Sequence, residues 1–544
     1  QLLQVVCSYL QQEDTVTDRS KYLALTGHSL ALAAFFTLQM VGRNAAAEPT
    51  SASKAKVTHQ HLDQNWGPGF GIGQFNWFHH ASQGAMIVPY DWFMSLEQPT
   101  TDSSMPEMEL FSDPVYLRRF GFLPSVPEDK FNPGNLPIGF AIGKNWVDPN
   151  KPSSRPTTAL GLTCAACHTS EVSYVGTRLR IDGGSAMINL GAFQRDLGLA
   201  LLITNSSAKK FDAFANRWIK HQPIPKELTG ENRAKLEAKA KGLLKVELEK
   251  AVTDLLKKQK RDADLNIRPV DGGFGRTDAF ALIGNRVFGL LGTMNLAQTN
   301  APVNYPHLWD TPWFYRVQYN GSIRLPMVRN IGEALGLGAR INSDFESTVD
   351  VEHLHQMEDQ IAGGKPFTGL KAPAWPEQLL GEIKGFKHRD GKWKRGKVLY
   401  EKHCLHCHYR IDDIETALSR GVEHEQFKEY WTQPNQFGRS FVKLPAINFV
   451  DIGTDPLTVT EFYRRTVYTG SVTSDYSMLS AVEALTIATS RVRKRAYEKL
   501  KLSAEEHAAY DGYRELSGDP AAAFKLEYKA RPLNGVWATA PFLH

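Results

Sequence analysis

Two short segments of the chain combine paired cysteines with an adjacent histidine. The first is "CAACH" at 164–168, and the second is "CLHCH" at 404–408. Together they hold four of the five cysteines, and the fifth, Cys7, lies near the N-terminus. A spacing of three places two thiols on one turn of the chain, and the next residue adds an imidazole. Such a cluster is suited to binding a metal or a metal-containing cofactor.

The C-x-x-C-H pattern is typical of covalently attached c-type haem, in which two thiols join the vinyl groups and the imidazole binds the iron. A zinc site shared by both pairs, or disulfide bonds, would use the same cysteines, but neither explains a histidine after each pair. The sequence therefore predicts two covalently bound haem c groups. The expected attachment and ligand residues are Cys164, Cys167 and His168 for the first haem, and Cys404, Cys407 and His408 for the second.

The sixth coordination position of each iron decides whether a haem reacts or only transfers electrons. No histidine occurs between His168 and His221, and Met187 is the only methionine there. Either Met187 closes the first iron, or that iron is open to O₂ or hydrogen peroxide.

The second iron has four candidate sixth ligands downstream of its motif. Two of them, His424 and His507, lie in polar segments typical of solvated helices. The better candidates are His544, which ends a segment rich in Pro, Gly and aromatic residues, and Met478, which follows a polar turn.

The N-terminal region has the layout of a secretory signal peptide. Arg19 and Lys21 precede an apolar run at 22–41, and small residues then offer a cleavage site near Ala47. The alternative is a transmembrane anchor, because the run is nearly long enough to span a bilayer. No later segment is long and apolar enough to do so. We therefore expect an exported, soluble mature protein, periplasmic or secreted. The chain does not begin with Met, so we also expect its natural start to differ.

Composition gives a globular class and excludes one kind of partner. The 544 residues are 42% apolar and 22% charged, with a net charge of +5. No basic stripe with interleaved aromatic residues occurs, so we do not expect nucleic-acid binding. The 43 Gly and 29 Pro residues are scattered, which indicates long loops.

The chain divides into five expected segments. An apolar 3.6-residue period predicts a surface helix over 231–260, and a short helix should precede the second motif. The second haem domain stops abruptly and looks truncated. The expected segments are a leader at 1–47, an N-terminal extension at 48–155, a first haem domain at 156–345, a linker at 346–386 and a second haem domain at 387–544.

The N-terminal extension offers a few further polar candidates. We expect His79 and His80 to be exposed or helix-capping residues rather than ligands. Gln83, Tyr90 and Trp92 either line a substrate route or pack in the core.

The two motifs and the segments around them resemble the dihaem cytochrome c peroxidase and MauG superfamily, and within it the rubber-oxygenase-like (RoxA-like) branch. The resemblance runs in order along nearly the whole mature chain. It is carried by "QGAMIVPYDWFMSLEQ" (83–98), "TCAACHTSEVSYVGTRLRIDGG" (163–184), "GRTDAFALIGNRVF" (275–288), "APVNYPHLWDTPWF" (301–314), "VLYEKHCLHCH" (398–408), "IGTDP" (452–456) and "ARPLNGVWATAPFLH" (530–544).

The resemblance implies a mainly α fold: two cytochrome-c-like haem domains with long loops, haems at their interface, and a loop-rich N-terminal extension. It implies an open first haem that binds O₂ and a second haem closed by His408 and His544. Peroxidases usually have a distal histidine soon after the first motif, and this chain has none. The resemblance also places Tyr319 at the inter-haem aromatic position, where other members carry Trp, and Glu333 near the distal pocket as a possible acid/base group.

Three functions remain open at the level of sequence. An exported haem oxygenase would use O₂ at the His168 haem to cleave a carbon–carbon double bond of a hydrophobic polymer or small organic substrate. A peroxidase would reduce hydrogen peroxide there, with electrons from the second haem and a donor protein. A non-enzymatic dihaem electron carrier would have both irons six-coordinate. The missing distal histidine favours the oxygenase.

Overall fold

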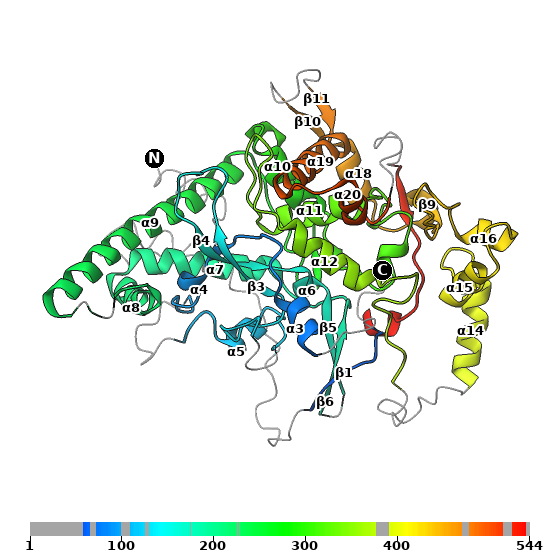
Figure 1. Cartoon of the computed structure of the whole chain (residues 1–544), viewed down its shortest axis with the longest axis horizontal. Coiled ribbons are helices and arrows are strands. Elements are labelled where there is room, and N and C mark those ends of the chain that lie inside the picture. Colours follow the sequence, from blue (N-terminus) through cyan, green and yellow to red (C-terminus); the bar gives the residue numbers. More distant parts are fainter. Residues whose placement is uncertain are drawn as a thin grey trace, which may run out of the picture.

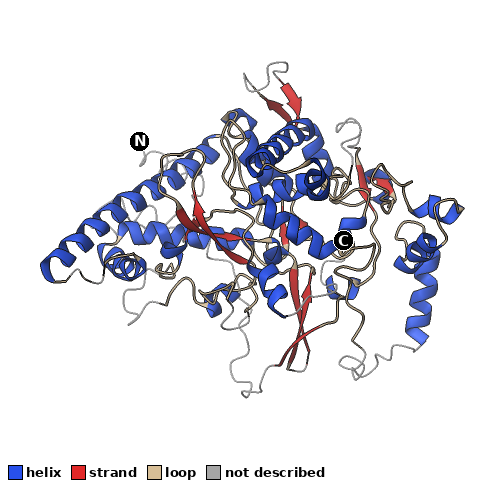
Figure 2. Cartoon of the chain, viewed as in Figure 1, coloured by secondary structure: helices blue, strands red, loops and turns tan. Residues whose placement is uncertain are grey.

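A computed structural model describes residues 58–65, 72–99, 109–125, 130–174, 176–225, 227, 229–376, 391–469, 478–514 and 525–539. The described part is rich in helices and contains several short β-strands (Figure 2). Helix is therefore the main element, as predicted, although small sheets hold much of the N-terminal half together. His544 and the predicted leader at 1–47 lie outside the described residues.

Two three-stranded sheets frame the first motif. In one, β4 pairs antiparallel with both β2 and β3. In the other, β6 pairs parallel with β1 and antiparallel with β5. The strands are β1 (Thr58–His61), β2 (Val88–Pro89), β3 (Phe140–Trp146), β4 (Thr157–Leu162), β5 (Thr169–Tyr174) and β6 (Thr177–Asp182).

Helices cover these sheets and form the first hydrophobic core. The predicted helix at 231–260 is confirmed as α9, which extends along one side of the molecule (Figure 1). Its buried residues Leu244, Leu248 and Val252 pack in this core. The helices are α3 (Ile72–His80), α4 (Tyr90–Phe93), α5 (Pro114–Arg118), α6 (Cys164–Cys167), α7 (Leu190–Ser206), α8 (Ala208–Trp218) and α9 (Gly230–Asp264).

A second core lies between helices that are far apart in the sequence. Helix α11 contacts α10, α12 and α19, so its apolar side is enclosed by elements from both predicted haem domains. The helices are α10 (Ala279–Phe288), α11 (Pro326–Leu337), α12 (Val351–Ala362), α18 (Leu457–Arg464), α19 (Ala481–Leu500) and α20 (Ala504–Tyr510).

The second motif belongs to a smaller group of helices at the edge of the molecule (Figure 1). The predicted short helix before it is confirmed as α14 (Gly391–His403). Helices α15 (Ile411–Ser419) and α16 (Glu425–Tyr430) pack around Trp431 and Phe314 in a core of their own. Phe314 comes from the first predicted haem domain, so this group is attached to the main body through that ring.

Short elements complete the connections. Strand pairs β7–β8, β9–β12 and β10–β11 are antiparallel. The remaining elements are β7 (Arg276–Thr277), β8 (Val303–Asn304), β9 (Ala446–Asn448), α17 (Phe449–Ile452), β10 (Thr466–Tyr468), β11 (Met478–Ser480), β12 (Glu527–Lys529) and the 3₁₀ helices η1 (Ile219–His221), η2 (Thr293–Asn295), η3 (Thr311–Trp313) and η6 (Val536–Thr539).

The sheets and cores cross two of the predicted domain boundaries. Strand β3 of the expected extension pairs with β4 of the expected first haem domain, and α19 packs on α10 and α11. The five-segment division stays a prediction, and the extension shares its core with the first motif. Among the described residues, no helix combines the length and apolar character needed to cross a bilayer.

Candidate haem-binding site

The first motif forms α6, a single helical turn directly after the buried end of β4. The amide of His168 donates to the carbonyl oxygen of Cys164 over 3.0 Å, which places the imidazole on the same turn as the thiols. Gly139 packs directly against this turn with φ of +90°, and a Cβ atom there would lie 2.3 Å from Cα of Ala166. The backbone of β3 therefore approaches α6 as closely as only glycine allows.

The imidazole of His168 is held by a backbone carbonyl from a distant loop. Its Nδ1 lies 2.7 Å from the carbonyl oxygen of Pro306. A proton on Nδ1 leaves the Nε2 lone pair available to a metal, the usual arrangement for a ligating histidine. The loop is fixed in turn, because the Leu308 amide donates to the carbonyl of Gly183 over 2.8 Å. With two thiols on the same turn, this donor set fits covalent haem c.

Burial determines the protonation states of the first ligand set in the folded chain. Burial lowers the pKa of His168 to about 4; the Pro306 hydrogen bond opposes this effect, and the charges of Arg329 and Arg531 add to it. The imidazole is therefore neutral at pH 7, as a metal ligand must be. Burial, with the charge of Glu333, raises the pKa of Cys164 to about 12, so this thiol is protonated in the folded chain.

A hollow opens beside His168 and Cys164, and its empty space is about 370 Å³ when its opening to solvent is included. Helices α11 and α12 supply most of its wall, although they follow the motif by more than 150 residues in the sequence. One part of the wall is apolar and another carries charged side chains. The lining residues are Cys164, His168, Leu308, Thr311, Pro312, Arg329, Asn330, Glu333, Leu354, Met357, Glu358 and Ile361.

The predicted acid Glu333 lies in this wall. Burial raises its pKa, although the Arg329 charge and a hydrogen bond from Gln318 oppose the effect. The Gln318 amide donates to Glu333 Oε1 over 3.4 Å. Glu333 is only partly exposed, and a carboxyl with a raised pKa in such a place is suited to proton transfer.

A buried ion pair stands next to Glu333. Arg329 on α11 donates to Glu358 on α12, and the Asn330 amide donates to the same carboxylate oxygen over 3.2 Å. Both charged side chains are nine-tenths buried. The pair joins the two helices and leaves Glu358 Oε1 without a hydrogen-bond partner in the described structure.

The second motif repeats the local geometry of the first. The His408 amide donates to the Cys404 carbonyl over 2.8 Å, and His408 Nδ1 lies 2.7 Å from the carbonyl oxygen of Arg531. The hydroxyl of Tyr400 on α14 also donates to the carbonyl of His408. Cys404, Cys407 and His408 are all partly exposed, whereas Cys167 and His168 are buried. This donor set fits haem c as well.

Tyr319 connects the two segments that hold the histidines. Its hydroxyl donates to Asn304 Oδ1 over 2.8 Å, two residues before Pro306. Its carbonyl accepts from the Lys529 amide over 2.7 Å, two residues before Arg531. Burial raises the pKa of Tyr319 to about 12, so the phenol is neutral. The inter-haem role of Tyr319 stays a prediction.

The histidine pair of α3 lies in the interior, so the prediction of exposed or capping histidines is wrong. His79 is 2% exposed, and its Nε2 lies 2.6 Å from Asp182 Oδ1. His80 is 4% exposed, with Nδ1 2.8 Å from the carbonyl of Phe140 and Nε2 2.8 Å from Ser125 Oγ. Their partners lie far along the sequence, which local polarity does not reveal.

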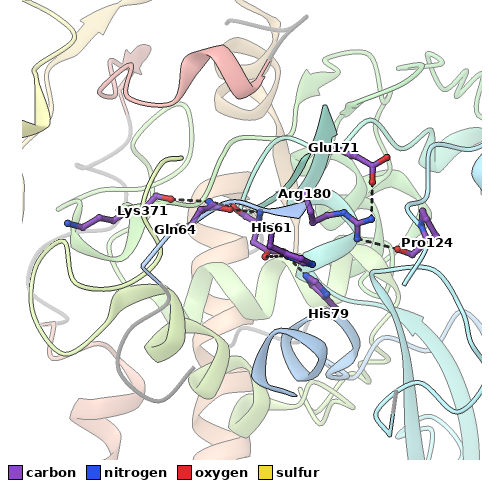
Figure 3. A network of polar contacts seen from close by, with 8 residues as sticks. His61, Gln64, His79, Pro124, Glu171, Arg180 and Lys371 are labelled. Carbon is purple, nitrogen blue, oxygen red and sulfur yellow. Dashed lines mark hydrogen bonds and ion pairs between the residues drawn. The ribbon is translucent and has the colours of Figure 1, made fainter. Parts of the chain in front are cut away.

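Asp182 ends β6 inside a network of polar contacts that supports the first site (Figure 3). Gln64 receives a hydrogen bond from the Asp182 amide and donates to the carbonyls of Asp182 and Lys371. Burial alone would raise the pKa of Asp182, but His79 and His61 hold it well below its usual range. The network fixes the end of β6 immediately before Gly183, to which the His168-holding loop is bonded.

The other predicted candidates separate into two groups. Gln83 lies at the site: it is 1% exposed, and Cys164 Sγ donates to its Oε1 over 3.4 Å. Trp92 packs in the first core against Phe214, and Tyr90 packs against the same core. These two contacts favour packing over a substrate route.

The predicted alternative for the first iron does not line the hollow, and the candidates for the second iron are exposed or lie outside the described residues. Met187 is partly buried and does not line the hollow in the described chain. Met478 is 54% exposed, and His424 is the exposed N-cap of α16. His507 is an exposed residue of α20 that lies against Tyr497. His544 is not described.

Sequence reasoning missed several residues that shape the two sites. Met357, Arg329 and Glu358 line the hollow, and Pro306 and Arg531 supply the carbonyl acceptors. Met357 Sδ also lies 3.9 Å from the Thr163 hydroxyl, next to Cys164. The amphipathic character of α12 was the available signal, because its inward side carries both Met357 and Glu358. Backbone acceptors leave no signal in side-chain patterns.

Comparison with known proteins agrees with these features. The family described as "RoxA-like, cytochrome c-like" matches residues 527–544, a segment that contains Arg531 and His544. The uncharacterized protein y4iJ of Sinorhizobium fredii (strain NBRC 101917 / NGR234) is 38% identical over 509 residues, which cover 89% of this chain and 78% of y4iJ. No solved structure shows significant similarity to the chain.

Proposed function

This chain belongs to the same protein family as y4iJ, and from that premise, together with its RoxA-like, cytochrome c-like segment, we propose a haem c-dependent oxidoreductase of the rubber-oxygenase type. One haem c is attached at each C-x-x-C-H motif. The first haem activates O₂ for oxidative cleavage of a hydrophobic substrate, and the second haem transfers electrons. The cytochrome c-like segment itself indicates covalent haem c with iron.

The observation that carries this proposal is the hollow beside His168. It brings together an oriented imidazole, a buried carboxyl group and an apolar wall of Leu308, Leu354 and Ile361. A reaction site for an apolar substrate needs these components: an iron ligand, a proton-transfer group and a region that excludes water.

The haem, when bound, supplies the redox chemistry, and the protein supplies ligation, positioning and proton transfer. His168 is held by Pro306 through Nδ1, so that Nε2 would be available to bind the iron. Glu333 retains its proton to a higher pH than an exposed glutamate and delivers or accepts it at Oε1 or Oε2. The Arg329–Glu358 pair keeps α11 and α12 together around the hollow.

The second site suits electron transfer to the first. His408 is oriented by the carbonyl of Arg531, and we propose His544 as the second axial ligand, on the resemblance of "ATAPFLH". Tyr319 lies between the carbonyl-bearing segments of both sites and is the proposed aromatic relay. The electron donor would be a separate protein, in the periplasm or outside the cell.

Reduction of hydrogen peroxide is the second candidate, and Glu333 is the observation that favours it. A buried acid beside a haem can donate the protons that peroxide reduction consumes. Met357 is the residue that would support a non-enzymatic electron carrier, because a thioether in the hollow is a potential axial ligand.

The test is an electronic spectrum of the full-length protein as isolated and with dithionite, imidazole and peroxide. We expect an O₂-type spectrum as isolated, or an imidazole-induced shift at one haem. Rapid high-valent formation with peroxide would favour the peroxidase. The variant Met357→Leu should leave the spectrum unchanged; conversion from low-spin to high-spin would identify Met357 as a ligand and support the electron carrier.

A further inference from the structure

Two basic side chains beside the first site have no carboxylate partner. Lys529 is the last residue of β12, and Arg531 lies two residues after it. Both lie over the ring of Phe314: Lys529 Nζ is 5.3 Å and Arg531 Cζ is 5.8 Å from its centroid. Among the described residues, no ion pair joins either of them to Asp or Glu.

The neighbouring buried cations are satisfied by the protein itself. Arg329 pairs with Glu358. Arg514 donates to three backbone carbonyls, at 3.0 Å, 2.6 Å and 2.9 Å. In contrast, Arg531 makes one long side-chain hydrogen bond, and its Nε has no acceptor in the described structure. Lys529 and Arg531 are themselves partly exposed, but the buried Arg531 Nε is costly to leave without an acceptor unless a ligand of opposite charge completes it.

The two cations face the first haem site. Arg531 Nη2 lies 3.4 Å from Thr311 Oγ1, and Thr311 lines the hollow that contains His168. Lys529 lies with Arg531 over the ring of Phe314, which follows the lining residues Thr311 and Pro312 in the sequence. The carboxylate of Asp310 accepts a hydrogen bond from the Asn534 amide over 3.0 Å. Its charge raises the pKa of Arg531.

We propose that Lys529 and Arg531 bind the propionate carboxylates of the haem attached at Cys164 and Cys167. Carboxylates are the groups that a guanidinium and an ammonium recognise through charge-assisted hydrogen bonds. Haem brings two of them, at a fixed place relative to the thioether bonds. This assignment rests on the proposed function, since it requires a haem at the first motif.

Arg531 then acts on both sites. Its guanidinium binds a carboxylate of the first haem, and its carbonyl oxygen holds His408 Nδ1 at 2.7 Å, at the second site. It is a positioning residue for the second iron and a binding residue for the first haem. Arg531→Met removes the charge and keeps the carbonyl, so the two roles can be separated.

The experiment is a redox titration of the purified full-length protein followed by electron paramagnetic resonance, which reports the two ferric haems separately. Arg531→Met and Lys529→Met should each make the first haem harder to reduce, since a nearby cation favours the reduced form. A charge at this separation changes the reduction equilibrium constant about tenfold, or ~59 mV for one electron. The second haem should change much less, and Arg531→Lys should restore most of the wild-type potential.

Lys525→Met is the matched control, because its side chain is 68% exposed on the same segment, and it should leave both potentials unchanged. Unchanged potentials in both test variants, or a change confined to the second haem, would overturn the assignment. The mass of the wild-type protein is measured first. Absence of haem from the first motif would contradict the proposed function. Attached haem with unchanged potentials in the variants would contradict only this inference. If Arg531→Met fails to fold, Lys529→Met alone decides.

Discussion

The two C-x-x-C-H motifs have almost the same local geometry and very different surroundings. In both, the histidine amide donates to the carbonyl of the first cysteine, and Nδ1 lies 2.7 Å from a distant backbone carbonyl. The first motif is enclosed by sheets and by α11 and α12, which place Glu333, Arg329 and Met357 beside it. The second lies in the small α14–α16 group and remains partly exposed.

The difference shows that attachment chemistry and reactivity are determined at different levels. Five consecutive residues are sufficient to arrange two thiols and an imidazole. The groups that would move protons or exclude water come from helices that the rest of the chain must bring to the site. On this view only the first motif is a reaction site, and each of the following experiments tests that asymmetry.

Removing the cysteines of each motif in turn should give the largest effect. Cys164→Ser/Cys167→Ser and Cys404→Ser/Cys407→Ser should each lose about half of the covalently bound haem, because thioether bonds need the thiols. Haem content per chain and the spectral response to imidazole or peroxide are the measurements. Only the first double variant should abolish that response. Equal responses in both variants would show that the two motifs do not differ in reactivity.

Glu333→Gln should lower turnover by roughly 100-fold or more, the usual contribution of a general acid or base. Because burial raises the pKa of Glu333, the wild-type rate should fall as pH rises through this raised pKa, above the usual range for glutamate. The variant should lack this part of the pH profile. Glu352→Gln, at an exposed position of α12, is the control. A wild-type pH profile in Glu333→Gln would show that the hollow is not a proton-transfer site.

Asp182→Asn should reduce the free energy of unfolding by about 2 kcal/mol at pH 7, since it removes a charged acceptor from a buried network. The pKa of Asp182 is depressed in the folded chain, so its stabilisation is present above the unfolded value of about 3.9 and is lost as pH falls below it. Urea unfolding at pH 7 and at pH 3 should therefore show the difference from wild type shrinking in acid.

The same variant tests whether the network supports the first motif alone. Its spectral change should be confined to the first haem, and Asp344→Asn, an exposed position, should have no effect. Equal disturbance of both haems would indicate a general loss of packing instead.

Tyr319→Phe should have the smallest effect, about 1 kcal/mol, from loss of the hydrogen bond to Asn304. The ring is kept, so electron transfer between the haems should be nearly unchanged, whereas Tyr319→Leu should slow it. Stopped-flow reduction monitored at both haems measures this rate. Equal rates in wild type and Tyr319→Leu would exclude the tyrosine as a relay.

Predictions that depend on neighbouring residues were more accurate than predictions that depend on residues far apart in the sequence. The helices α9 and α14 come from local patterns, and both were predicted correctly. Haem attachment at the two motifs stays a prediction. The burial of His79 was not predicted, because its partner Asp182 is 103 residues away. The Arg329–Glu358 pair joins two helices whose facing sides are set by tertiary packing. The sixth ligands stay predictions, since His544 lies outside the described residues.

The enclosure of α6 also sets an order of events during biogenesis. Thioether formation needs accessible, reactive thiols, but in the folded chain Cys167 is buried and the pKa of Cys164 is raised to about 12. The segments that enclose them are made later, from Pro306 to Ile361. On the proposed function, haem would therefore have to be joined to the first motif before these segments fold over it. The cofactor would then serve as a template on which α11 and α12 close, and a chain that misses this interval would fold around an empty motif.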